Sequence, residues 1–285
     1  MLLTEINLPT PIEKFKFRGR EYFIKRDDMT HPLFSGNKAR KLWFLLDKDL
    51  SNYKKLISYG SAQSNAMLSL SYLAKLKGLK FDYYVSHIAS FLEKNPHGNF
   101  LEALKNGMNL KVGDVPNSFN HDELFINEGG YEKEAEIGIK ILAKEIEDWC
   151  QSEGRVVDLF LPSGTGTTAL YLQKNLPHLK VWTTACVGDS HYLKEEFSGL
   201  LSDEKLHPTI LNPPKKYYFA KLYKELYEIW LELKKAGIEF DLVYDPVGWI
   251  TMLSHHDKFK NPILYIHQGG VLGNESMIKR YDYKF

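Results

Sequence analysis

Apolar and polar positions alternate along the chain with two different periods, and each period predicts its own kind of element. Short apolar runs bounded by glycine or proline predict strands, and apolar residues three or four positions apart predict helices. The predicted strands are residues 54–60, 79–86, 109–114, 155–162, 180–187, 240–247 and 262–267. The predicted helices are residues 65–78, 91–107 and 134–150, with another helix beginning near Lys38 and helical periodicity over 215–235.

The order of these elements predicts the fold class. From residue 54 onward, strands and helices follow one another in turn, which is typical of α/β proteins with parallel sheets and right-handed crossovers. The strand RVVDLFLP at 155–162 shows little alternation, as expected for a sheet that helices cover on both faces. We therefore expect mostly parallel sheets flanked by helices.

Composition narrows the class of protein. The 285 residues are 44% hydrophobic and 26% charged, and the formal net charge of +1 gives no general attraction for nucleic acid. The chain contains no run of 18 apolar residues, and its N-terminus, MLLTEINLPTPIEKF, lacks the features of an export signal. Cys150 and Cys186 lie far apart without metal-binding spacing. We expect a cytoplasmic protein with free buried thiols, no metal site and no nucleic-acid or membrane partner.

The stretch FSGNKARKLWFLL, residues 34–46, crowds three cations into the first turn of a predicted helix. The Ser-Gly-Asn turn at 35–37 is typical of a helix N-cap. Lys38, Arg40 and Lys41 oppose the helix dipole there, at a cost on the order of 0.3–1 kcal/mol each. A nearby anion would offset this cost, and a solvated basic turn is the alternative. Because Lys38 shares a helical face with the leucines that follow, we expect its amine at the edge of the core.

Two loops that follow predicted strands carry groups suited to anions. In GSAQSN, residues 60–65, a hydroxyl, amides and helix-start N–H groups suit a carboxylate, although serine and asparagine also serve as plain helix caps. In SGTGTT, residues 163–168, two glycines let backbone N–H groups approach an anion, and Ser163 and three threonines add hydroxyl donors. The second loop therefore predicts a phosphate site.

Two kinds of phosphate ligand fit the SGTGTT loop. The spacing Gly164-x-Gly166-x-x-Ala169 matches the looser dinucleotide fingerprint, although Asp189, the nearest acid for a ribose, comes late. The density of hydroxyls favours a terminal phosphate monoester instead. A monoester site, a lysine at the edge of a core and a carboxylate site together predict pyridoxal 5′-phosphate with an amino-acid substrate.

Six motifs also occur in an order that is typical of one family. SGNKARKL, SYGSAQSN, INEGGY, LPSGTGTT, DPV and IHQGG are distributed over nearly the whole chain. In this order the chain resembles the pyridoxal-phosphate enzymes 1-aminocyclopropane-1-carboxylate (ACC) deaminase and D-cysteine desulfhydrase. The resemblance implies a tryptophan-synthase-β-like fold (fold type II) and a homodimer. It also implies a larger cofactor domain of residues 1–42 and 126–285 and a smaller inserted α/β domain of residues 43–125.

The resemblance further implies roles for single residues. Lys38 matches the Schiff-base lysine, and Ser64 matches the serine that approaches the substrate carboxylate and helps to move protons. The implied substrate-binding residues are Gln63, Ser64 and Asn65. The implied cofactor-binding residues are Lys38, Asn37, Lys41, Asn65, Gly164, Thr165, Gly166, Thr167 and Thr168.

One motif departs from the family pattern. After DPV the family carries an active-site tyrosine and a partner for the cofactor's ring nitrogen, whereas this chain has Gly248 and Trp249. Both roles are vacant at those positions, and Tyr218 and Tyr223 are candidates to replace another family tyrosine. The resemblance implies a lyase or deaminase that acts on a small amino acid, most like D-cysteine desulfhydrase or ACC deaminase. The alternatives are a cofactor-binding homologue without turnover and a dinucleotide-dependent oxidoreductase.

Overall fold

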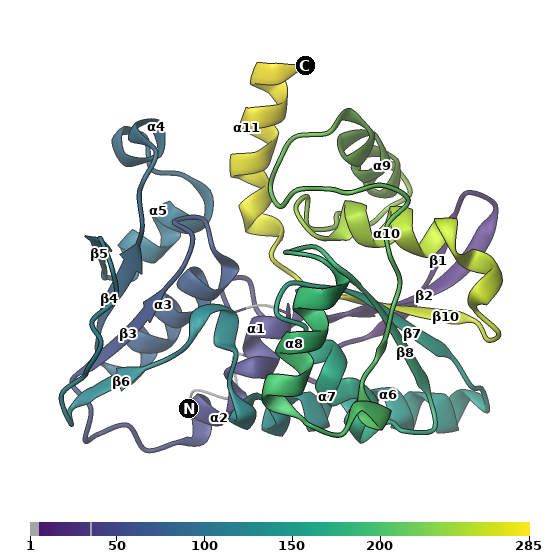
Figure 1. The fold of residues 1–285 in the computed structure, drawn as a ribbon, viewed down its shortest axis with the longest axis horizontal. Helices are drawn as coiled ribbons and strands as arrows, with labels where there is room; N and C mark the ends of the chain where they lie inside the picture. The colour runs from purple at the N-terminus through teal and green to yellow at the C-terminus, as the bar shows by residue number, and fades with distance from the viewer. Residues whose placement is uncertain (1–5, 35) are drawn as a thin grey trace.

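The computed structural model describes residues 6–34 and 36–285, which form two lobes, each built around a β-sheet (Figure 1). The larger sheet has six strands in the order β1-β2-β10-β7-β8-β9. They are β1 (Ile12–Phe17), β2 (Arg20–Arg26), β7 (Asp158–Ser163), β8 (Lys180–Ala185), β9 (Thr209–Ile210) and β10 (Ile263–His267). All neighbouring pairs are parallel except β1 and β2, which form a hairpin that the sequence did not predict. Arg18 and Gly19 both have positive φ, as a tight hairpin turn requires.

The smaller sheet has four parallel strands in the order β5-β4-β3-β6. They are β3 (Lys55–Tyr59), β4 (Lys80–Val85), β5 (Met108–Val112) and β6 (Glu123–Phe125), and the helices between them are α3 (Asn65–Lys77), α4 (Ser90–Lys94) and α5 (Gly98–Lys105). Side chains of α3 and α5 share one hydrophobic core with this sheet. The limits of the two predicted domains, at residues 43 and 125, stay a prediction.

Helices cover both faces of the larger sheet (Figure 1). On one face lie α6 (Glu136–Glu153) and α7 (Thr167–Asn175), and on the other lie α9 (Lys224–Lys235) and α10 (Asp245–Ser254). The remaining helices are α1 (Gly36–Lys41), α2 (Trp43–Asp47), α8 (Ser190–Leu200) and α11 (Asn274–Lys284). Among the described residues, no helix combines the length and apolar character that crossing a bilayer requires.

The predicted fold class is confirmed, and the predicted strands except residues 240–247 are present. Residues 240–247 are not a strand, because the Asp241 carboxylate accepts the N–H groups of Val243 and Tyr244 in a turn and α10 begins at Asp245. Both cysteines are free and buried, as predicted.

Three predicted helices are shorter or divided. Residues 91–107 contain α4 and α5, separated around Pro96, which cannot continue a helix. The helix expected from Lys38 onward ends at Lys41 and resumes at Trp43, because Leu42 leaves the helical conformation. Within 215–235, the helix begins only at Lys224.

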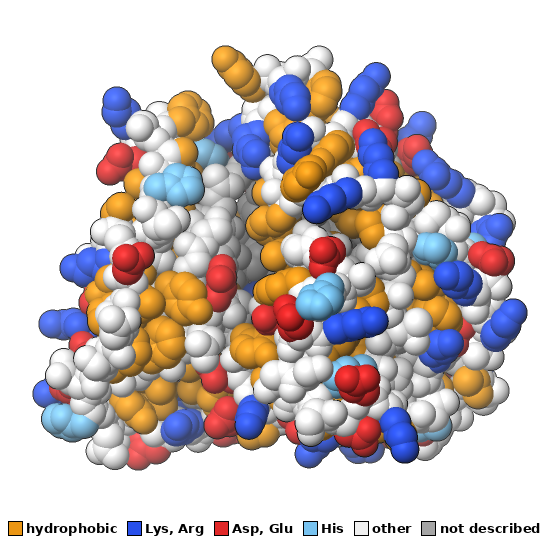
Figure 2. Space-filling view, viewed as in Figure 1, with side chains coloured by type: hydrophobic (Ala, Val, Ile, Leu, Met, Phe, Trp, Pro, Cys, Tyr) orange, Lys and Arg blue, Asp and Glu red, His pale blue; other side chains and the backbone are white. Residues whose placement is uncertain are grey.

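A deep hollow separates the two lobes on the face seen in Figure 2. The loops that follow β3, β6, β7 and β10 meet there. A Cβ on Gly270, after β10, would lie 2.3 Å from the side-chain nitrogen of Asn65, and one on Gly129, after β6, would lie 3.6 Å from the Thr165 methyl group. Ligands of open α/β sheets bind at such carboxyl ends of strands.

Candidate active site

Helix α1 carries the three cations, and its start is fixed to the end of β10. Gly36 has a φ of +58°, and a Cβ there would lie 1.6 Å from the Gln268 carbonyl oxygen, so the position requires glycine. The backbone N–H of Asn37 donates to that carbonyl at 3.0 Å, and its side-chain amide donates to Gln268 Oε1 at 3.0 Å. Gln268 Nε2 donates to the carbonyl of Pro162 in β7 at 2.6 Å. Ser35, the first residue of the predicted N-cap, lies outside the described residues.

Lys38 is partly buried on α1. Burial lowers the pKa of its amine to about 8, although the carboxylates of Asp241 and Glu128 oppose that shift. A neutral amine is therefore accessible close to neutral pH, as a nucleophile or a proton acceptor requires.

Arg40 points away from the hollow and is fully buried. Its guanidinium donates to Asp27 at 3.0 and 2.8 Å and to Glu145 at 2.7 and 2.8 Å. Lys25 also donates to Glu145, at 2.5 Å. The protein's own carboxylates thus neutralise this cation, so the expectation that a ligand anion offsets all three cations of α1 is wrong for Arg40.

Lys41 faces the SGTGTT loop. Its Nζ lies 3.2 Å from Thr165 Oγ1, which lies 3.1 Å from Thr167 Oγ1. Burial and the charge of Lys38 lower the pKa of Lys41 well below its ordinary value. Because α7 begins at Thr167, its free N–H groups open toward the same loop. An amine, two hydroxyls and a helix start therefore gather where an anion was predicted.

Two further loop residues have structural roles. Gly166 has a φ of +72°, and a Cβ there would lie 2.3 Å from the Phe197 ring, so the turn requires glycine. The Ser163 hydroxyl lies 2.7 Å from Thr183 Oγ1 inside the sheet. Ser163 is therefore not one of the free hydroxyl donors of this loop, contrary to the expectation. Thr168 is buried in the first turn of α7.

The 60–65 loop lies across the hollow, at the start of α3. The Ser64 hydroxyl caps this helix by accepting the N–H groups of Ala66 and Met67 at 3.1 and 3.4 Å. Asn65 Oδ1 accepts the Asn99 amide at 2.6 Å, and Asn99 also donates to the Gln63 carbonyl at 3.0 Å. The plain capping role of Ser64 is thus realised, and the partner for its hydroxyl proton is the Tyr83 hydroxyl.

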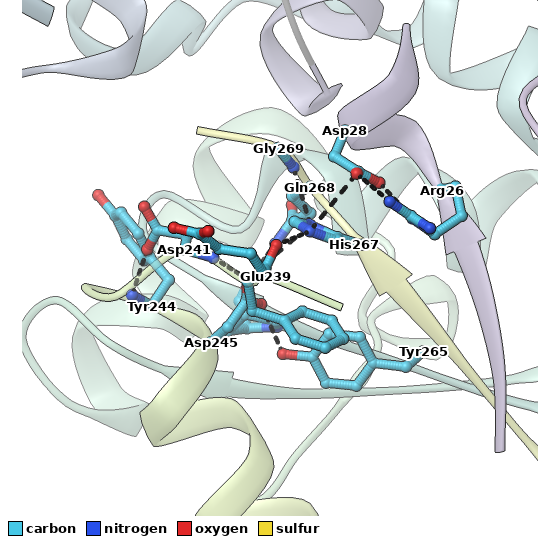
Figure 3. A network of polar contacts seen from close by, with 12 residues as sticks. Arg26, Asp28, Glu239, Asp241, Tyr244, Asp245, Tyr265, His267, Gln268 and Gly269 are labelled. Carbon is cyan, nitrogen blue, oxygen red and sulfur yellow. Dashed lines mark hydrogen bonds and ion pairs between the residues drawn. The ribbon is translucent and has the colours of Figure 1, made fainter. Parts of the chain in front are cut away.

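Residues 241–245, DLVYD, bring a tyrosine and two acids close together, with Tyr265 next to Asp245 (Figure 3). The Asp241 carboxylate interacts with Lys38 and with the Asn65 side chain. The Tyr244 ring lies 3.5 Å from the position of a Cβ on Gly164. The Asp245 carboxylate, 1% exposed, accepts the Tyr265 hydroxyl at 2.6 Å and the Asp241 N–H at 3.0 Å.

Gly248 and Trp249, by contrast, lie in the hydrophobic core. Trp249 is 0% exposed and packs against the rings of Phe15, Tyr22 and Tyr265 at 4.8 to 5.8 Å between centroids. A Cβ on Gly248 would lie 2.8 Å from the Tyr265 hydroxyl. The segment that reaches the site is therefore 241–245, which ends at the first residue of the DPV motif, and not the two residues that follow that motif.

Solved structures of known proteins match this arrangement along almost the whole chain, whereas no protein-family model matches the sequence. An ACC deaminase homologue superimposes with a TM-score of 0.81 and 23% identity, over 96% of this chain and 94% of that one. A hydrogen sulfide-producing enzyme from Fusobacterium nucleatum superimposes with a TM-score of 0.66 and 14% identity, over 96% of this chain and 98% of that one. A threonine deaminase from T.th. superimposes with a TM-score of 0.63 and 14% identity, over 92% of both chains. The chain has the fold of these enzymes. The predicted fold type II is thereby confirmed.

Within this fold, the structure adds residues that the sequence did not single out. Asp241 and Tyr244 were hidden in a predicted strand, although an aromatic residue between two acids is unusual in a core strand, and Asp245 was noted only as the first residue of the DPV motif. Glu128 was part of the INEGGY motif but received no role. Gln268 is revealed only by its contacts with α1.

Of the two predicted replacement tyrosines, Tyr218 lies on the surface and Tyr223 is partly buried. Tyr218 is 57% exposed, and its N–H donates to the Tyr223 hydroxyl at 3.2 Å. Phe219, next to Tyr218, contacts the Tyr244 ring at 5.4 Å between centroids. Tyr244 is therefore the tyrosine that reaches Gly164 directly.

Proposed function

We propose that this protein is a pyridoxal 5′-phosphate-dependent lyase or deaminase that acts on a small amino acid. One observation carries the proposal: Lys41, which contacts Thr165 at 3.2 Å, lies one helical turn after Lys38. Side chains three positions apart on a helix are neighbours, so one small molecule can reach both the Lys38 amine and the 164–168 loop. The fold shared with deaminases and a sulfide-producing enzyme supports the same assignment.

The residues present fit this cofactor. Gly164 has no side chain, so its backbone can approach a phosphate closely, and the Tyr244 ring lies 3.5 Å from the position of its Cβ. Thr165, Thr167 and the N–H groups of α7 suit a phosphate monoester, and Lys41 supplies a cation. Lys38 would hold the cofactor through its amine, Asn37 and Asn65 would help to bind it, and Asp245 would be the acid available to its ring nitrogen.

When bound, this cofactor withdraws electrons from the substrate's Cα and so weakens the bonds there. The chain's own residues do the rest. Gln63, Ser64 and Asn65, with the first N–H groups of α3, would hold the substrate carboxylate. Lys38, with its lowered pKa, would accept the Cα proton. Tyr244 would pack against the reacting groups and keep water out.

Two reactions remain candidates within this class. In a reaction like that of D-cysteine desulfhydrase, D-cysteine and water yield pyruvate, ammonia and hydrogen sulfide. In a reaction like that of ACC deaminase, the cyclopropane ring opens instead. We favour the elimination from D-cysteine. The dinucleotide alternative leaves Lys38 without a role, and the homologue without turnover predicts bound cofactor but no product. We also propose the predicted homodimer, whose mass in solution would be twice that of the 33.0 kDa chain.

The experiment begins with the visible absorbance of the purified protein after incubation with pyridoxal phosphate. We expect a lysine-bound cofactor band that Lys38→Ala loses and that Lys144→Ala, at an exposed lysine of α6, retains. Pyruvate and sulfide are then measured with D- and L-cysteine, and the 2-oxo acid is measured with ACC. A wild-type protein that binds no cofactor would end the proposal, and bound cofactor without any product would favour the homologue without turnover.

A further inference from the structure

Glu128 is a carboxylate in the hollow that holds no substrate group in the proposed reaction, although its charge acts on the Lys38 amine. It lies in the short turn Glu128–Gly130 after β6, and its side chain is exposed to solvent. A Cβ on Gly60 would lie 2.8 Å from Glu128 Oε1 and 2.7 Å from the Tyr83 hydroxyl, so the carboxylate borders the start of the 60–65 loop. Across residues 6–34 and 36–285, this carboxylate has no hydrogen-bond or ion-pair partner.

Its surroundings contain one amine, neutral aromatic rings and a second acid. Burial raises the pKa of Glu128, and the amine of Lys38 opposes this shift. Burial also raises the pKa of the Tyr83, Tyr192 and Tyr244 hydroxyls, with a smaller contribution from the Glu128 charge, so these rings stay neutral. Glu196 is close enough that the Glu128 charge helps to raise its pKa, after burial. Figure 2 shows acidic side chains on both rims of the hollow.

These charges favour one kind of substrate side chain. In the neutral form that accepts a proton, Lys38 no longer balances Glu128. The space between Glu128 and the aromatic rings then has a negative potential, which attracts cations both through the carboxylate and through the ring faces. An anionic side chain would meet repulsion from Glu128 and Glu196. A neutral substrate side chain would leave the Glu128 carboxylate without a charged partner.

We propose that Glu128 selects an amino-acid substrate whose side chain ends in an ammonium group. This inference rests on the proposed function and names its substrate class, with an amine in place of a thiol as the leaving group on Cβ. The smallest such substrate is 2,3-diaminopropionate, which has the carbon skeleton of serine and cysteine. The charge of Glu128 would also favour the charged form of the substrate's side-chain amine.

The reaction balances with water as the only co-reactant. Lys38 accepts the Cα proton, and the Cβ–N bond breaks with both electrons going to nitrogen, so the side-chain ammonium leaves as ammonia. Water then hydrolyses the released 2-aminoacrylate to pyruvate and a second ammonia. One 2,3-diaminopropionate and one water thus give one pyruvate and two ammonia, with no oxidant or reductant.

The test compares serine, cysteine and 2,3-diaminopropionate, each as both enantiomers, on the cofactor-loaded enzyme. Binding is followed by the change in cofactor absorbance on titration, and pyruvate release gives kcat/KM. The variant is Glu128→Gln, and its matched control is Glu134→Gln, which removes the same charge from an exposed position six residues away. Absorbance before titration reports whether each variant folds and binds cofactor.

We expect the wild-type enzyme to bind one enantiomer of 2,3-diaminopropionate at least about tenfold more tightly than serine, because a charged pair replaces a neutral contact. Glu128→Gln should remove the preference for 2,3-diaminopropionate and change serine binding by less than about twofold. Glu134→Gln should preserve that preference. Equal losses for serine and 2,3-diaminopropionate, or a wild-type preference for serine or cysteine, would overturn the inference while leaving the proposed function intact. A protein that binds no cofactor would overturn both.

Discussion

The amine of Lys38 illustrates how the surroundings of a single residue set its chemistry. Burial lowers its pKa to about 8, and Asp241 and Glu128 prevent a larger decrease. A lysine with an ordinary pKa would be almost entirely charged at neutral pH and therefore a poor nucleophile. The two carboxylates thus set the pH range in which this amine can react.

This arrangement predicts the pH dependence of cofactor capture. Because only the neutral amine reacts, the rate for the cofactor-free protein should rise with pH, reach half of its maximum near pH 8 and then level off. Glu128→Gln removes a charge that raises this pKa, so its midpoint should move to lower pH. Stopped-flow absorbance between about pH 6 and 10 measures both curves, with Glu134→Gln as control. A midpoint that moves upward in Glu128→Gln would contradict the assignment.

Asp245 and Trp249 allow the position of the site to be tested at the residue scale. Burial and the Asp241 charge raise the pKa of Asp245, so this carboxyl group ionises only when a cation lies beside it. Asp245→Asn keeps the shape and can still accept the Tyr265 hydroxyl but can no longer ionise, so the rate of 2-oxo-acid release should fall roughly tenfold or more. Trp249→Phe should leave that rate within about twofold and lower the free energy of unfolding by about 1–3 kcal/mol, because it leaves a void in the core. Coupled product assays and urea unfolding measure the two quantities. The reverse pattern would place Trp249, and not Asp245, in the active site.

At the scale of elements, the 163–168 loop, which we propose binds the cofactor's phosphate, depends on a backbone that only glycine permits. Gly166→Ala places a Cβ 2.3 Å from the Phe197 ring at a φ of +72°, so α8 or the loop has to move. We expect cofactor affinity to fall by at least about tenfold, as seen by absorbance titration. Gly154→Ala is the matched control, since Gly154 has a φ of +59° but no atom within 4 Å of its Cβ position. It should cost about 1 kcal/mol of stability and leave affinity unchanged.

The hairpin, α1 and α6 are joined by a buried ionic cluster of Arg40, Asp27, Glu145 and Lys25. Arg40→Met leaves the Asp27 carboxylate buried without its main partner, so unfolding by urea should show a loss of about 3–5 kcal/mol. Lys144→Met breaks an exposed pair with Asp148 and should cost less than about 1 kcal/mol. Equal, small effects would mean that water reaches the cluster and solvates Asp27.

At the scale of the whole molecule, the candidate site belongs to neither lobe alone. The larger sheet contributes α1, the 163–168 loop and residues 241–245, and the smaller sheet contributes the 60–65 loop and Glu128. The lobes also touch above the hollow, where the Gly98 N–H of α5 donates to Glu275 of α11 at 3.0 Å. Substrate held at the 60–65 loop therefore meets Lys38 only while the two lobes keep this spacing.

The sequence by itself determined the parts whose signals are local. Hydrophobic periodicity identified most strands and helices of both sheets, and the GNK and SGTGTT motifs drew attention to the cations of α1 and to the 163–168 loop that Lys41 contacts. Such signals survive because a glycine with positive φ, a helix start or a buried strand needs particular residues within a few positions.

Only the tertiary structure decided which of these residues act together. Arg40 and Lys41 are neighbours in sequence, yet one pairs with carboxylates in the core and the other faces Thr165, because successive helix positions point in different directions. Asp241 and Glu128 approach Lys38 from segments about two hundred and a hundred residues away, so no local pattern could reveal them. The burial that lowers the pKa of Lys38 likewise exists only once the lobes pack around it.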